Sequence, residues 1–125
     1  MRAIFSLCGL ILLIGGIFLW RSFHQPIVFG EFTGAPQAEI IDVIDRPQDY
    51  LNKTVALQGQ IAKQCETMGC YFYFITKGGK ELRVDLAQIA MNAPQGKNGH
   101  QARVEGRTAP YDKGYQFMAS AVEFE

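Results

Sequence analysis

The residues best suited to chemistry in this sequence are two cysteines, Cys65 and Cys70, with four residues between them. The residues before and after the pair alternate in the manner of strands, so the segment between the cysteines is predicted to be a hairpin loop. Residues that face each other across such a hairpin lie about 4.5–5.5 Å apart, within the range of a disulfide bond. The spacing therefore predicts a disulfide between Cys65 and Cys70 that stiffens the hairpin tip.

Two alternatives stay open for the same residues. The two thiolates, with Met68 between them, form a soft ligand set that suits copper(I), so copper is the alternative to having no cofactor. The pair is also a candidate for thiol–disulfide redox chemistry, although it lacks the helix N-terminus that lowers a thiol pKa in C-x-x-C proteins. The sequence contains no Ser-His-Asp set, phosphate-binding loop or metalloprotease motif, so we expect a protein that is not an enzyme.

A second group of residues suits binding rather than reaction. Tyrosines alternate along the strand that follows the cysteines, and arginines lie on later strands at positions expected to face away from the core. OB-fold proteins stack bases on such rings, so an oligonucleotide- or oligosaccharide-binding domain is a further alternative. The chain has 12 basic and 12 acidic residues, and this neutral balance leads us to expect no nucleic acid partner. The candidate binding face consists of Tyr71, Tyr73, Arg83, Arg103 and Arg107.

The elements that must position these residues are mostly strands. Alternation of period two predicts five of them, with a helical turn between the third and the fourth. This order is typical of a five-stranded OB-fold barrel, in which Gly59 would let the first strand bend. A short helix, broken at Pro47, comes before the barrel. The predicted strands are 55–61, 70–75, 81–86, 100–107 and 115–124, with the helix at 38–52, a hairpin turn at 77–80, a helical turn within 87–92 and a turn region at 108–114.

The N-terminal segment is predicted to be a membrane anchor, residues 1–21. Residues 3–20 carry no charge and would span roughly 27 Å as a helix, close to the thickness of a bilayer core. Phe-Leu-Trp-Arg at its end is a poor cleavage site, which favours a retained helix over a cleaved signal peptide. Residues 22–37 are predicted to be a linker and residues 38–125 the barrel domain. The bilayer-facing residues of the anchor would include Phe5, Leu10, Leu13, Phe18 and, at the interface, Trp20.

Residues 38–125 also resemble a known family. The matching pattern is a short helix, a V-x-L-x-G-x-I strand, a Cys-x4-Cys pair with glycine before the second cysteine, a V-D pair and a later V-E-G. It resembles small exported bacterial OB-fold domains of the tRNA-anticodon-like and DUF4920-like kind, and it implies an OB fold outside the cytoplasm. The residues that carry it are Val55, Leu57, Gly59, Ile61, Cys65, Gly69, Cys70, Val84, Asp85, Val104, Glu105 and Gly106.

These inferences lead to one functional expectation. We expect a single-pass protein of the bacterial inner membrane, whose soluble domain faces the periplasm or the exterior. The domain is expected to be a binding or structural module, an accessory subunit of a membrane protein complex. Its partners would be the lipid bilayer and other proteins of that complex.

Overall fold

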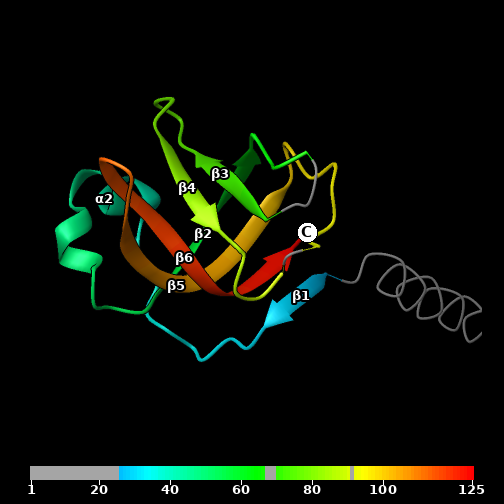
Figure 1. Cartoon of the computed structure of the whole chain (residues 1–125), viewed down its shortest axis with the longest axis horizontal. Helices are drawn as coiled ribbons and strands as arrows, with labels where there is room; N and C mark the ends of the chain where they lie inside the picture. Colours follow the sequence, from blue (N-terminus) through cyan, green and yellow to red (C-terminus); the bar gives the residue numbers. More distant parts are fainter. Residues whose placement is uncertain (1–25, 67–69, 91) are drawn as a thin grey trace, which may run out of the picture.

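Five strands close into a barrel in the computed structural model, which describes residues 26–66, 70–90 and 92–125 (Figure 1). Around the barrel, β2 is followed by β3, β4, β6 and β5, and β5 pairs again with β2. The neighbours β4 and β6 run parallel, and the other four pairs are antiparallel. This closure confirms the predicted OB-fold barrel. The strands are β2 (Val55–Ala62), β3 (Tyr71–Ile75), β4 (Glu81–Asp85), β5 (Gln101–Tyr111) and β6 (Gly114–Phe124).

The barrel interior is filled by side chains from alternate positions of all five strands. Phe72 and Phe74 point inward from β3, and their rings meet edge to face with centroids 5.1 Å apart. Phe72 also meets Phe124 of β6, at 6.0 Å. Alternation on β3 therefore sends the phenylalanines into the core and leaves the tyrosines on the outer surface. The largest fully buried side chains of the strands include Leu57, Ile61, Phe72, Phe74, Val84, Val104, Phe117, Val122 and Phe124.

A short helix, α2 (Ile40–Asp45), packs on the barrel through Ile40 and Val43, and a 3-10 helix, η1 (Pro47–Tyr50), follows it. The chain changes direction before Pro47, as predicted. Gly59 on β2 lies under the helix, because a Cβ atom there would come within 2.5 Å of the Ile40 Cδ1 atom. This glycine therefore provides room for the helix, in addition to any effect on the bend of β2.

The last two strands are longer than the sequence predicts. The turn region expected at 108–114 reduces to Asp112 and Lys113, since β5 continues to Tyr111 and β6 starts at Gly114. Asp112 has a φ of 51°, which is typical of a tight hairpin turn. Pro110 and Gly114 lie near the end of this hairpin, within the two strands. The helical turn predicted between the third and fourth strands is present at residues 87–89 as a turn.

Part of the predicted linker is a strand. β1 (Ile27–Gly30) pairs antiparallel with β6, and the ring of Phe29 packs edge to face on Phe124, 6.3 Å away. Farther along, the N–H groups of residues 33–35 bind the side chain of Glu105. The segment from 27 to 38, called the arm below, is thus fastened to the barrel rather than free. Among its apolar residues, Phe29 packs on β6, whereas Ile27 and Val28 are exposed.

The predicted membrane anchor, with Phe5, Leu10, Leu13, Phe18 and Trp20, lies outside the described residues. Within the described residues, no helix has the length and apolar character needed to span a bilayer. The anchor therefore stays a prediction from the sequence.

Candidate binding face

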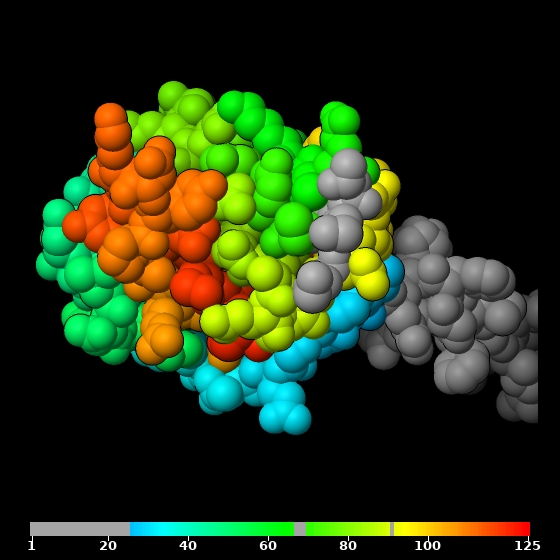
Figure 2. Space-filling view, viewed as in Figure 1, coloured from blue at the N-terminus to red at the C-terminus, as the bar shows by residue number. Residues whose placement is uncertain are grey.

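Four strands form one continuous outer face, because β3, β4, β6 and β5 lie side by side in that order. Figure 2 shows this face towards the viewer, with the greens of β3 and β4 next to the orange and red of β5 and β6. The strand register aligns the outward residues into rows across the face. One row contains Tyr71, Asp85, Met118 and Arg107, and the next contains Tyr73, Arg83, Gln116 and Ala109.

Arg83 lies at the centre of this face between two aromatic rings. Its guanidinium carbon is 4.0 Å from the ring centroid of Tyr71 and 4.6 Å from that of Tyr111. The Nε–H group donates a hydrogen bond of 3.1 Å to the Gln116 side-chain oxygen. The side chain is only 16 % exposed, and an Nη atom lies 3.9 Å from the Asp85 carboxylate. The contacts with both rings and the bond to Gln116 together restrain the guanidinium.

The face brings together four of the five binding residues predicted from the sequence. The Tyr71 ring meets the Tyr73 ring edge to face and the Arg83 guanidinium through a cation–π contact, and Tyr73 is the register partner of Arg83. Arg107 is exposed and lies beside Met118 in the register of β5 and β6. We define the tyrosine face by these residues and their neighbours: Tyr71, Tyr73, Arg83, Asp85, Arg107, Tyr111, Gln116 and Met118.

Arg103 lies elsewhere on the barrel. It forms an ion pair of 2.8 Å with Glu123 on β6, and its guanidinium carbon is 4.2 Å from the ring centroid of Phe32. The register places it next to Gln58 of β2, and the arm reaches it through Phe32. A bend and a register shift in β5 between Glu105 and Gly106 separate it from Arg107. Arg103 is therefore a contact of the arm and not part of the tyrosine face.

Tyr111 and Gln116 also belong to this candidate face, although neither is among the binding residues predicted from the sequence. Tyr111 was assigned to a turn, although Arg107, Ala109 and Tyr111 continue an outward alternation that contained the signal. Gln116 lies on a strand that was predicted, but nothing in the sequence indicates that it meets Arg83. That contact depends on the parallel pairing of β4 with β6, between strands about 30 residues apart in the chain.

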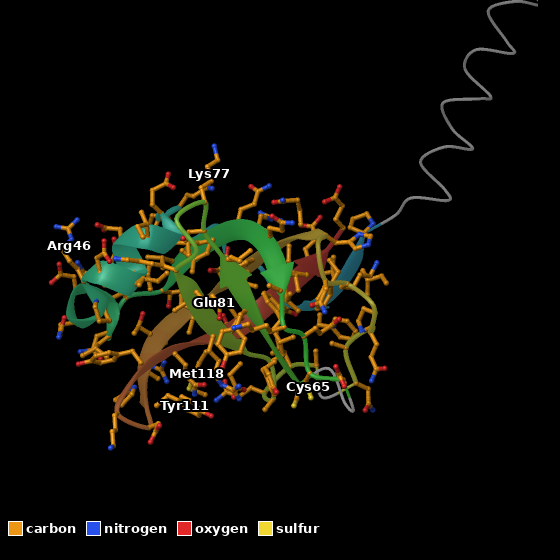
Figure 3. The ribbon with its side chains drawn as sticks, turned by 90° about the horizontal axis from the view of Figure 1, so that it is seen from above. Arg46, Cys65, Lys77, Glu81, Tyr111 and Met118 are labelled. Carbon is orange, nitrogen blue, oxygen red and sulfur yellow. The ribbon has the colours of Figure 1, made fainter. Side chains whose placement is uncertain are left out.

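The two cysteines lie at the border of the tyrosine face, and Figure 3 shows Cys65 on the same side of the barrel as Tyr111 and Met118. Their Sγ atoms are 3.6 Å apart, with the Cys70 thiol donating to the sulfur of Cys65. Burial and this hydrogen bond raise the pKa of the Cys70 thiol above its usual value. A raised pKa disfavours the thiolate, so Cys70 is not an activated nucleophile in this arrangement.

The metal alternative has little to support it in the described part of the chain. No group of three or more His, Cys, Asp or Glu side chains among those residues is placed to hold a metal ion. Met68, the third ligand considered for copper(I), lies outside the described residues. Of the three residues considered as copper(I) ligands, the described part of the structure therefore contains two, Cys65 and Cys70.

A second surface feature is an open groove of about 770 Å³ between α2 and the β3–β4 hairpin. Isoleucine and glutamine side chains make up much of its lining, together with Glu39, Thr76 and two lysines. The groove has no aromatic or arginine side chain in its lining, so it offers a ligand less stacking and fewer fixed donors than the tyrosine face. Its lining includes Ile40, Ile41, Gln58, Gln60, Lys77 and Lys80.

The described strands define an OB-fold barrel, and the tyrosine face lies on four of them, β3, β4, β6 and β5. Comparison with solved structures agrees with this class. The chain is similar to the structure of the hypothetical protein ygiW from E. coli, with a TM-score of 0.50 and 13 % identity, covering 77 % of this chain and 99 % of that chain. At this identity the likeness concerns the fold alone. The sequence matches no protein-family model and no curated protein.

Proposed function

We propose that the protein is a membrane-anchored, non-catalytic binding module, an accessory subunit of a membrane protein complex that holds its partner on the tyrosine face. The observation that carries the proposal is the Arg83 guanidinium fixed between Tyr71 and Tyr111. A side chain held in this way loses little further freedom when a partner binds, so less entropy opposes association.

The composition of the face favours a protein partner. Tyrosine, arginine and methionine are enriched at the centres of protein interfaces, whereas lysine and glutamate are depleted there. The tyrosine face has three tyrosines, two arginines and Met118, and its Asp85 lies beside Arg83. The arm supports the same proposal, because β1 and Glu105 attach the barrel firmly to the segment that would precede it in the membrane.

The first test uses capture of the partner from membranes. We expect that Arg83→Ala lowers the amount of partner recovered with the full chain in mild detergent by about tenfold, the loss of a central interface residue. Arg103→Ala is the matched control, since it removes an arginine that also contacts a ring but lies beside the arm, away from the tyrosine face. Equal recovery with both variants, once each is shown to fold, would contradict the proposal.

The position of the face favours a second candidate, an oligosaccharide. OB barrels bind oligosaccharides and oligonucleotides on the strands that carry Tyr71, Tyr73 and Arg83 here. The neutral charge of the chain favours the uncharged ligand of the two. This candidate predicts that the purified full chain binds neutral oligosaccharides on an array and that Tyr73→Ala weakens the binding without changing the fold. A purified chain that binds no sugar but retains a protein partner rejects it.

A further inference from the structure

We infer that Cys65 and Cys70 are a site of reversible oxidation, whose disulfide fixes one border of the tyrosine face. This goes beyond a permanent structural disulfide, because the same two residues are held together in the reduced state as well. The effect on a bound partner rests on the proposed function, whereas formation of the disulfide does not.

The backbone already holds the two cysteines in position. The Cys65 N–H group donates to the Tyr71 carbonyl oxygen at 3.0 Å, and the Leu86 N–H group donates to the Cys70 carbonyl oxygen at 2.8 Å. The sulfurs, 3.6 Å apart, must approach by about 1.5 Å to reach a disulfide bond length. Rotation of the two side chains can supply a movement of this size, so oxidation does not require the strands to separate.

The same hydrogen bonds connect the cysteines to the binding residues. Cys70 is the residue before Tyr71, and Cys65 binds the Tyr71 carbonyl, so both cysteines adjoin the residue whose ring supports Arg83. A covalent bond at this point restrains the backbone of Tyr71 and, through its ring, the position of the guanidinium. Breaking the bond returns that border of the face to hydrogen bonds alone.

The chemistry is a two-step exchange with a small disulfide such as oxidised glutathione. One cysteine thiolate attacks a glutathione sulfur, which forms a mixed disulfide and releases one glutathione thiolate. The second cysteine thiolate then attacks the protein sulfur of the mixed disulfide, which closes the Cys65–Cys70 bond and releases the second glutathione. The two cysteines lose two electrons, the oxidised glutathione gains them, and the two thiol protons end on the two glutathione molecules.

The accessibility and the acidity of Cys70 affect the rate of this thiol–disulfide exchange. Cys65 is buried whereas Cys70 is half-buried, so Cys70 is the more accessible sulfur. Because burial raises the pKa of the Cys70 thiol, little of it is thiolate at neutral pH. We expect the exchange to become faster as the pH rises towards that pKa.

The test uses the full chain with Cys8→Ser, so that the two cysteines of the pair are the only thiols counted. After incubation with oxidised glutathione, we expect both thiols to resist maleimide labelling and the protein to be lighter by two hydrogen atoms. Dithiothreitol should restore both labels. Cys65→Ser and Cys70→Ser are the matched controls, which form at most a mixed disulfide with glutathione. Two thiols that still react after oxidation, or copper(I) bound by the pair in place of a disulfide, would overturn the inference.

The coupling to the face is measured without any partner. We expect the NMR signals of the Tyr71 ring and the Arg83 Nε–H group to shift between the reduced and oxidised chains. The ring signals of Tyr50, which lies on η1 and bonds to Asp42, should stay in place. A disulfide that leaves the Tyr71 and Arg83 signals unchanged would overturn the coupling. Because no partner is present, this result is independent of any failure of the proposed function.

Discussion

Replacing Glu105 with glutamine should lower the free energy of unfolding of the barrel by about 2–4 kcal/mol. Glu105 is 1 % exposed, and its two carboxylate oxygens accept four hydrogen bonds from the arm. One oxygen binds the N–H and hydroxyl groups of Thr33, both at 2.8 Å, and the other binds the N–H groups of Gly34 and Ala35 at 3.0 and 3.1 Å. In a glutamine, an NH₂ group replaces one of the two oxygens. The two groups of the arm that donate to that oxygen would then face another donor, so two hydrogen bonds are lost.

The same residue predicts how stability depends on pH. Burial by itself would raise the pKa of Glu105, but the four hydrogen bonds outweigh it and the pKa is lowered. A carboxyl whose pKa is lower in the folded than in the unfolded state stabilises the fold fully above the unfolded value, about 4.5. This contribution is lost as the pH falls through the folded pKa. We therefore expect the wild-type chain to lose stability below about pH 4.5 more steeply than the Glu105→Gln variant.

Urea unfolding of the full chain in mild detergent, followed by tyrosine fluorescence, measures both effects. Glu123→Gln is the control, because Glu123 pairs with Arg103 at a partly exposed site and such pairs contribute about 0–1 kcal/mol. Amide hydrogen exchange gives a second readout, since loosening of the arm should speed exchange in β1 more than in β3. A Glu105→Gln variant as stable as the Glu123→Gln variant would show that the arm is not held by this carboxylate.

The second large effect is expected for Gly106→Ala, which should destabilise the barrel by about 2–3 kcal/mol. A Cβ atom at Gly106 would lie 2.1 Å from the Met118 carbonyl oxygen and 2.9 Å from the Ala119 Cα atom. Both are backbone atoms of the neighbouring strand, which cannot move aside without breaking the β5–β6 pairing. The glycine is thus required where the register of the two strands shifts, between Glu105 and Gly106.

Gly78→Ala is the matched control for this prediction. Nothing lies within 4 Å of a Cβ atom built at Gly78, in the β3–β4 hairpin, so the change should alter stability by no more than about 0.5 kcal/mol. Thermal unfolding of the two variants under the same conditions compares them directly. If the Gly106→Ala variant has the same melting temperature as the wild type, the close approach of β5 and β6 at this point is not maintained in solution.

These expectations also separate the roles of neighbouring residues. Glu105 and Gly106 belong to the V-E-G pattern of the sequence, and we expect both to act on stability. Arg83 and Tyr111 are expected to act on binding, because they lie on the tyrosine face of the proposed function. A variant of the first pair should therefore reduce partner recovery only in proportion to the unfolded fraction, whereas Arg83→Ala should reduce it in a folded protein.

Much of the barrel was determined by the sequence itself. The alternation in 55–61, 70–75 and 81–86 specifies which side chains enter the core, because a half-buried strand needs an apolar residue at every second position. The short loop between Cys65 and Cys70 also acts locally, because it brings the ends of two adjacent strands together. The two sulfurs are 3.6 Å apart. The outward direction of Tyr71, Tyr73 and Arg83 also follows from local period alone.

Only the tertiary structure decided which outward residues share a surface. Arg103 and Arg107 are equivalent in pattern, yet the register shift in β5 lies between them, and Arg103 contacts the arm whereas Arg107 lies on the tyrosine face. Glu105 sits at an outward position of β5 and is buried because the arm crosses it. The four-residue strand β1 forms because β6 has a free edge there, and Arg83 meets Gln116 because barrel closure pairs β4 with β6. Such contacts depend on long-range strand pairing, which no local period encodes.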